Sequence, residues 1–165
     1  IRDLGASIGG MMLATRVGAG IAAEIGSMVV TEQVDALRMC SADPVEYLVV
    51  PRFIASVVMT FCLLIWACFV AYVSGMVTAN VVFDVNYLTF ANFMLVDSGD
   101  VIVGLAKCLA YGAAIPIVSA QRGLSTFGGS EGVGAATTSA VVSSSLAVIV
   151  LQFIISAVGY FVFPG

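Results

Sequence analysis

The chain has 165 residues, of which 61% are hydrophobic and only 10% are charged. A soluble domain carries about 25% charged residues, so lipid is the expected solvent for this chain. The net charge of −4 rests on few residues and offers no basic patch for nucleic acid. Histidine is absent and the four cysteines form no CxxC pair, so we expect no catalysis, no metal site and no cofactor.

Four apolar stretches are long enough to be membrane-spanning helices. They cover about residues 4–30, 49–79, 101–120 and 140–163. Each reaches the roughly 20 residues that a helix needs to cross about 30 Å of hydrocarbon. Helices are expected because lipid leaves every backbone amide to be satisfied within the chain. The sequence predicts an all-α polytopic bundle that forms one domain over residues 1–165. The first residue is Ile1 and no signal peptide is visible, so we expect the N-terminal part to be missing.

A row of the smallest side chains follows the first span at every fourth position. It consists of Ala6, Gly10, Ala14, Gly18, Ala22 and Gly26. Such rows let two membrane helices approach backbone to backbone. Because an α-helix has 3.6 residues per turn, the row winds around the helix and can serve several neighbours. The sequence leaves open whether these neighbours belong to the same chain or to a second copy.

Two charged residues, Arg16 and Glu24, interrupt the first span. An arginine in mid-bilayer costs about 2.5–3.5 kcal/mol, so such residues usually face a bundle interior or a wet cavity. The two lie about 12 Å apart along the helix, which is too far for a tight pair. Each is expected to contact substrate or gate a pathway, or else to anchor helices. Lys107, two turns inside the third span, is expected to extend to the outer membrane surface.

The segment between the first two spans, residues 31–52, is rich in charge. Residues 31–39 predict a short amphipathic helix with Val34 and Leu37 at the centre of its apolar side. Asp43 is expected to cap the next helical turn, with Pro44 at its first position. A short helix between two spans suits docking into a groove on a soluble partner.

Basic residues near span ends mark the cytoplasmic side of a membrane. Arg38, Arg52 and Arg122 therefore place the first and third loops inside, although Arg2 lies on the wrong side. The second loop, residues 80–100, has acidic but no basic residues, so it is expected outside together with the C-terminus. The residues Phe83, Tyr87, Phe90 and Met94 have helical spacing. They predict a short helix in the outer interface or, alternatively, a hairpin that dips into the membrane.

The third loop contains a glycine-rich run at residues 128–134. It imitates a phosphate loop but lacks the Lys and Ser/Thr that complete a Walker A motif. We therefore expect no ATP binding by this chain. The run predicts a flexible turn, with Thr137 or Thr138 capping the last helix.

Several ordered motifs resemble the MlaE/YrbE permease family. They are RVG at 16–18, AEIG at 23–26, TEQVDAL at 31–37, DP at 43–44, LVVPR at 48–52, GGSEGVG at 128–134 and ATT at 136–138. The resemblance covers nearly the whole chain. It departs at Cys40-Ser41-Ala42, where relatives usually have Met-Gly-Val, which puts the turn before Pro44 in doubt. It departs again at Ala135 and Ser139, where relatives often carry basic residues.

The resemblance implies an ABC transporter permease in the inner (cytoplasmic) membrane, with the plastid inner envelope as the less favoured alternative. Implied partners are a second permease copy in a homodimer, a cytoplasmic ABC ATPase, an MCE-domain lipid-binding protein and membrane lipid. The permease would move phospholipid or related lipid between the inner membrane and an outer compartment. Residues 31–47 would form the coupling helix in the ATPase groove. Its contacts would be Glu32, Gln33, Asp35, Ala36, Arg38, Asp43 and Pro44.

The lipid would lie in a cavity at the dimer centre, partly lined by the first span, with Arg16 and Glu24 as lipid-cavity or gating residues. Two other functions stay open. A secondary transporter or channel would show more ionisable groups at the membrane midplane and broken helices in paired repeats. A membrane scaffold without transport would tolerate an apolar residue at position 16.

Overall fold

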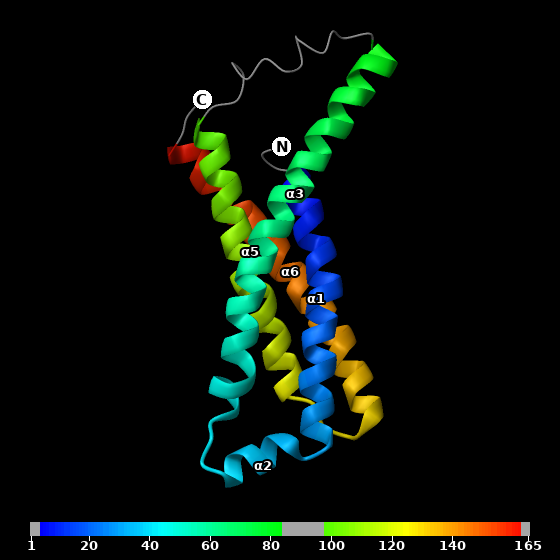
Figure 1. The fold of residues 1–165 in the computed structure, drawn as a ribbon, viewed down its shortest axis with the longest axis vertical. Helices are drawn as coiled ribbons and strands as arrows, with labels where there is room; N and C mark the ends of the chain where they lie inside the picture. The colour runs from blue at the N-terminus through cyan, green and yellow to red at the C-terminus, as the bar shows by residue number, and fades with distance from the viewer. Residues whose placement is uncertain (1–3, 84–97, 163–165) are drawn as a thin grey trace.

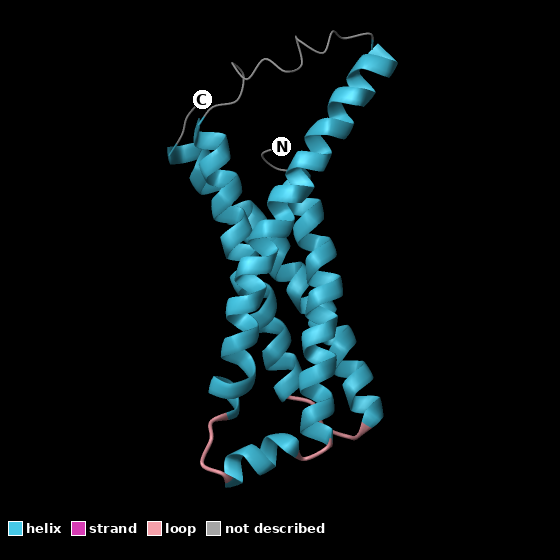
Figure 2. Ribbon diagram, viewed as in Figure 1, coloured by secondary structure: helices cyan, strands magenta, loops and turns pink. Residues whose placement is uncertain are grey.

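The computed structural model describes residues 4–83 and 98–162, and no strand occurs in these two segments (Figures 1 and 2). The elements are α1 (Leu4–Val30), α2 (Gln33–Met39), the π-helical turn η1 (Val45–Val49), α3 (Val50–Phe83), α5 (Ser98–Leu124) and α6 (Ser130–Val162). Four helices, α1, α3, α5 and α6, are long and apolar enough to cross a membrane. The predicted all-α polytopic bundle is thereby confirmed.

Helices α1, α5 and α6 form the core of the bundle, since each of them contacts the other two extensively. Helix α3 lies mainly against α5 and touches α1 less, and Figure 1 shows its end projecting beyond the other helices. Its outward side carries large exposed apolar residues such as Trp66, Phe69 and Val81. A surface of this kind is stable against acyl chains rather than water.

The connections from α1 to α3 and from α5 to α6 lie together at one end of the bundle (Figure 1). We call it the α2 end, because α2 lies across it. This placement agrees with the expectation that the first and third loops face the same compartment. The interfacial helix expected around Tyr87, Phe90 and Met94 lies outside the described residues.

The last span begins earlier than the sequence predicts. Helix α6 starts at Ser130 because Gly128 and Gly129, with φ of 91° and 78°, complete the turn that precedes it. Thr137 and Thr138 therefore do not cap the helix, as was expected. Each lies inside it and donates its hydroxyl hydrogen bond to the carbonyl four residues earlier, a bond that transmembrane helices commonly hold.

Candidate functional site

The small-residue row of α1 faces the core of its own chain. All six members are buried. The nearest neighbours of its three glycines come from α5, α6 and the connection between them. A Cβ built on Gly10 would lie 2.8 Å from Tyr111 Cδ2, and one on Gly18 would lie 3.0 Å from Ser119 Oγ. Gly10 and Gly18 each meet both α5 and α6, so the row lies in the angle between these two helices.

Three polar contacts join α5 to α6 along the buried seam between them, which we call the polar seam. Lys107 Nζ donates to Ser156 Oγ at 2.9 Å, the Tyr111 hydroxyl donates to Gln152 Oε1, and Ser119 Oγ lies 3.0 Å from Ser144 Oγ. The α5 residues of the seam are fully buried. Polar side chains that bond across helices are one of the forces that hold membrane helices together.

The expectation that Lys107 extends to the outer membrane surface is wrong. Its side chain is 0% exposed and is held by Ser156 instead. The sequence does contain a signal for the seam, because 107, 111, 115 and 119 on α5 and 140, 144, 148, 152 and 156 on α6 recur every fourth residue. These rows mix polar and apolar residues, so they do not stand out as the glycine–alanine row does.

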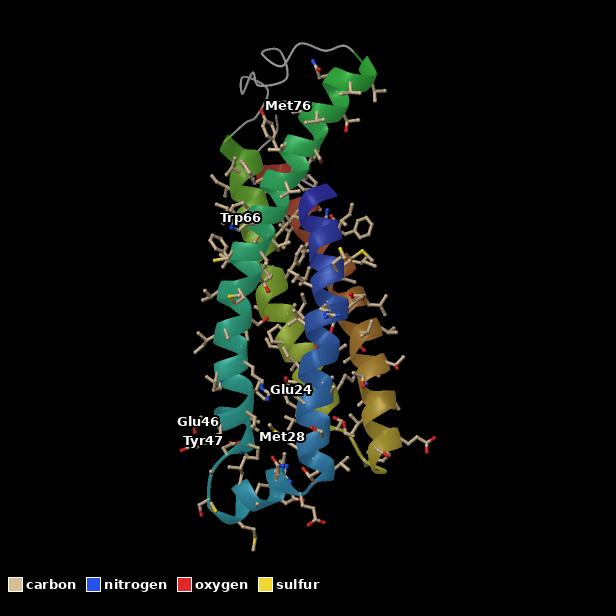
Figure 3. All side chains as sticks on the ribbon, turned by 45° about the vertical axis from the view of Figure 1, so that its right-hand side comes forward. Glu24, Met28, Glu46, Tyr47, Trp66 and Met76 are labelled. Atoms are coloured by element: carbon tan, nitrogen blue, oxygen red, sulfur yellow. The ribbon has the colours of Figure 1, made fainter. Side chains whose placement is uncertain are left out.

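Glu24 and Arg52 form an ion pair between α1 and α3. Arg52 Nη2 lies 3.0 Å from Glu24 Oε2, and Figure 3 shows Glu24 on the side of α1 that faces α3. The Glu24 side chain is 67% exposed, so the ion pair is partly open to its surroundings. Sequence reasoning singled out Glu24 but not its partner, which lies 28 positions away at the start of another helix. Arg16, two turns from Glu24 on α1, is exposed on the outside of the bundle.

Helix α2 presents most of the expected ATPase contacts to solvent. Glu32, Gln33, Asp35, Ala36, Arg38 and Asp43 are exposed, and Pro44 is buried. Val34, 4% exposed, is the buried residue on the inner face of α2. Asp35 and Arg38 form a surface ion pair of 3.2 Å. The outer face of α2 is therefore charged and unobstructed, while its inner face is anchored.

The turn after α2 keeps a glycine-type geometry without a glycine. Ser41 has φ of 58°, the left-handed region that glycine favours. The amides of Ser41 and Ala42 donate to the carbonyls of Arg38 and Leu37, at 3.0 and 3.1 Å. This is the Schellman pattern that closes many helices. Asp43 then accepts a hydrogen bond of 3.0 Å from the Val45 amide and so starts the next turn, as predicted.

Exposed apolar side chains also gather at the α2 end. Met39 is 88% exposed, Tyr47 is 66% exposed, and Phe127, from the connection between α5 and α6, is 86% exposed. Isolated exposed apolar residues are common, but three beside an exposed charged helix suit contact with another protein or with lipid headgroups.

Comparison with known proteins gives consistent matches. The family described as Permease MlaE matches residues 1–158. A "Probable ABC transporter permease protein" of Rickettsia felis is 43% identical over 94% of this chain and 61% of its own length. A probable ABC transporter permease protein of Synechocystis is 41% identical over 94% of this chain and 60% of its own length.

A third relative is the chloroplastic protein TRIGALACTOSYLDIACYLGLYCEROL 1 of Arabidopsis thaliana. It is 36% identical over 99% of this chain and 47% of its own length. The chain thus spans about three fifths of the bacterial relatives and about half of the plant protein.

Proposed function

Because the chain belongs to the MlaE permease family, we propose that it is the membrane-spanning permease part of an ABC transporter that moves phospholipid or a related lipid. The observation that carries the proposal is α2, a short exposed helix fixed between two spans. The lipid cargo is supported by the name of the plant relative, which refers to a galactolipid. Transport would run between the inner membrane and an outer compartment.

The proposed partners follow from the same membership. A separate ABC ATPase would hydrolyse ATP and bind α2, a second copy of the permease would complete a homodimer, and an MCE-domain protein would exchange lipid outside. Arg16, exposed near the middle of α1, is suited to face the second copy or the lipid, since an arginine in the membrane needs a polar neighbour.

Helix α2 is mechanically connected to two membrane spans, α1 and α3. Only two residues separate the end of α1 from α2, and α3 follows directly on η1. The α1–α2 and η1–α3 contacts and the ion pair between Glu24 and Arg52 couple these segments. Closure of the ATPase against α2 would therefore displace the ends of α1 and α3 together.

Charge reversal on α2 tests the ATPase assignment. Glu32→Lys with Asp35→Lys, made in the complete permease, should abolish co-purification with the ATPase and lipid transport. The change should not unfold the helix, because the surface pair it removes is worth about 0.2–0.5 kcal/mol. Glu131→Lys, an exposed acid at the same end but on α6, is the matched control. Unchanged association in the α2 variant would refute the coupling role.

The lipid role of the first span is tested by Arg16→Leu. Bound lipid is measured by mass spectrometry and transport in reconstituted vesicles. The proposal expects both to fall. Normal lipid content together with normal transport would show that Arg16 does not act on lipid and contributes only to packing.

A further inference from the structure

A groove opens between α1 and α3 on the half of the bundle nearer the α2 end. Its volume is about 350 Å³. The wall from α1 consists of Val17, Gly20, Ile21 and Glu24, and the wall from α3 consists of Arg52, Ala55, Ser56 and Met59. We call it the α1–α3 groove. Figure 3 shows Glu24 between the two helices that form it.

Two buried donors of the groove have no hydrogen-bond partner among the described residues. Arg52 uses Nη2 for Glu24, but its Nη1 is buried and unbonded. Ser56, 9% exposed and one turn further along α3, has an equally unbonded Oγ. A buried polar group without a partner destabilises the fold, so a ligand with acceptor oxygens would be favoured at both donors.

The rest of the groove is apolar and has free space. Val17, Ile21 and Met59 supply aliphatic walls. Gly20 stands at an opening, since a Cβ built there would meet nothing within 4 Å. A site with a polar end and an apolar wall fits an amphiphile better than a free ion.

The polar end lies at the depth of lipid headgroups. Arg52 is in the first turn of α3, a helix of 34 residues. Such a helix is about 51 Å long and exceeds the roughly 30 Å hydrocarbon core. Its first turn directly follows η1 at the α2 end, where the charged connection leaves the membrane, so Arg52 lies near the headgroup layer on that side. An arginine there binds phosphate favourably.

We infer that the α1–α3 groove binds a phospholipid of the leaflet on the α2 side whose headgroup carries an ammonium beside its phosphate. The phosphate accepts hydrogen bonds from Arg52 Nη1 and Ser56 Oγ after a small adjustment of both side chains. The ammonium pairs with the exposed carboxylate of Glu24, and an acyl chain follows Val17, Ile21 and Met59. One positive and one negative side chain match a zwitterionic headgroup.

The inference rests on the proposed function for the side of the membrane on which the groove lies. It names a lipid at that end of the transport path. Its test measures lipid binding and not transport. The lipid site can therefore be refuted while the ATPase contact at α2 stands, and the ATPase contact can be refuted while the lipid site stands.

The test uses the complete permease, delipidated in detergent and titrated with phosphatidylethanolamine or phosphatidylglycerol. Bound lipid is counted by native mass spectrometry. Gly20→Leu should fill the groove and weaken phosphatidylethanolamine binding about tenfold, a loss typical of overpacking by an added side chain. Gly104→Leu, on α5, is the matched control, because a Cβ at Gly104 also meets nothing within 4 Å. It should bind like the parent protein.

Glu24→Gln tests the headgroup. It removes the negative charge and leaves Arg52, so the preference should shift from phosphatidylethanolamine to phosphatidylglycerol. An unchanged preference would overturn the ammonium assignment. Equal binding by the Gly20→Leu and Gly104→Leu proteins would overturn the site. Displacement of lipid by phosphoethanolamine alone would show a site for a soluble phosphate compound and would also overturn it.

A measurement on the unsubstituted protein tests the lipid site independently of how any variant folds. Phosphatidylethanolamine with a diazirine in its acyl chain is photolysed on the permease, and the adducts are mapped by peptide mass spectrometry. Adducts on Val17, Ile21 or Met59 support the inference. Adducts confined to the far part of α3, around Trp66 and Phe69, would refute it.

Discussion

Gly10 offers the sharpest test of how α1 fits into the bundle. A methyl group in Gly10→Ala would lie 2.8 Å from Tyr111 Cδ2, 3.1 Å from Tyr111 Cε2 and 3.3 Å from Val148 Cγ1. Ordinary contacts of a Cβ are 3.4–4 Å, so the ring or the helix must move. Tyr111 is fully buried and its hydroxyl is bound to Gln152, which restricts such movement.

The expected loss follows from comparison with an open glycine. Gly104→Ala adds the same methyl group in free space, and both substitutions gain the helix propensity of alanine, up to about 1 kcal/mol. The difference between them is therefore the overpacking cost, about 1–3 kcal/mol.

Unfolding of the complete permease by sodium dodecyl sulfate, followed by circular dichroism, measures this difference. Gly10→Ala should unfold at a lower detergent fraction than Gly104→Ala. Equal midpoints would mean that Gly10 does not lie against α5 and α6, and the arrangement of the three core helices would be refuted.

Three further predictions concern the polar seam, the turn after α2 and the orientation. Tyr111→Phe removes the bond to Gln152 and should cost about 0.6–1.7 kcal/mol in the same unfolding assay; no loss would mean that the bond does not stabilise the bundle. Ser41→Gly should stabilise the turn by about 1 kcal/mol, since Ser41 has positive φ; slower hydrogen exchange in α2 would show it, and faster exchange would contradict it. A membrane-impermeant maleimide should label the exposed Cys40 only from the cytoplasmic side and should not label the buried Cys108 before unfolding; labelling of Cys40 from outside would reverse the proposed orientation.

The sequence identified the features that depend on local pattern. Apolar runs of sufficient length predict spans, because the hydrophobic thickness of the membrane sets the number of residues needed. The helix at α2 and the start of the next turn at Asp43 were predicted from charge, apolar spacing and capping chemistry. The departure at Ser41 was also visible, although only the structure shows that serine adopts the left-handed geometry itself.

The contacts between helices required the tertiary structure. Lys107 bonds Ser156, and Glu24 pairs with Arg52, because the rotation and relative height of separate helices bring these side chains together. No pattern within one helix specifies the rotation of another. The sequence by itself therefore determined that the chain lies in a membrane, which segments cross that membrane and which short helix lies at its surface. Only the packed bundle decided which buried polar groups have partners and which, in the α1–α3 groove, still lack one.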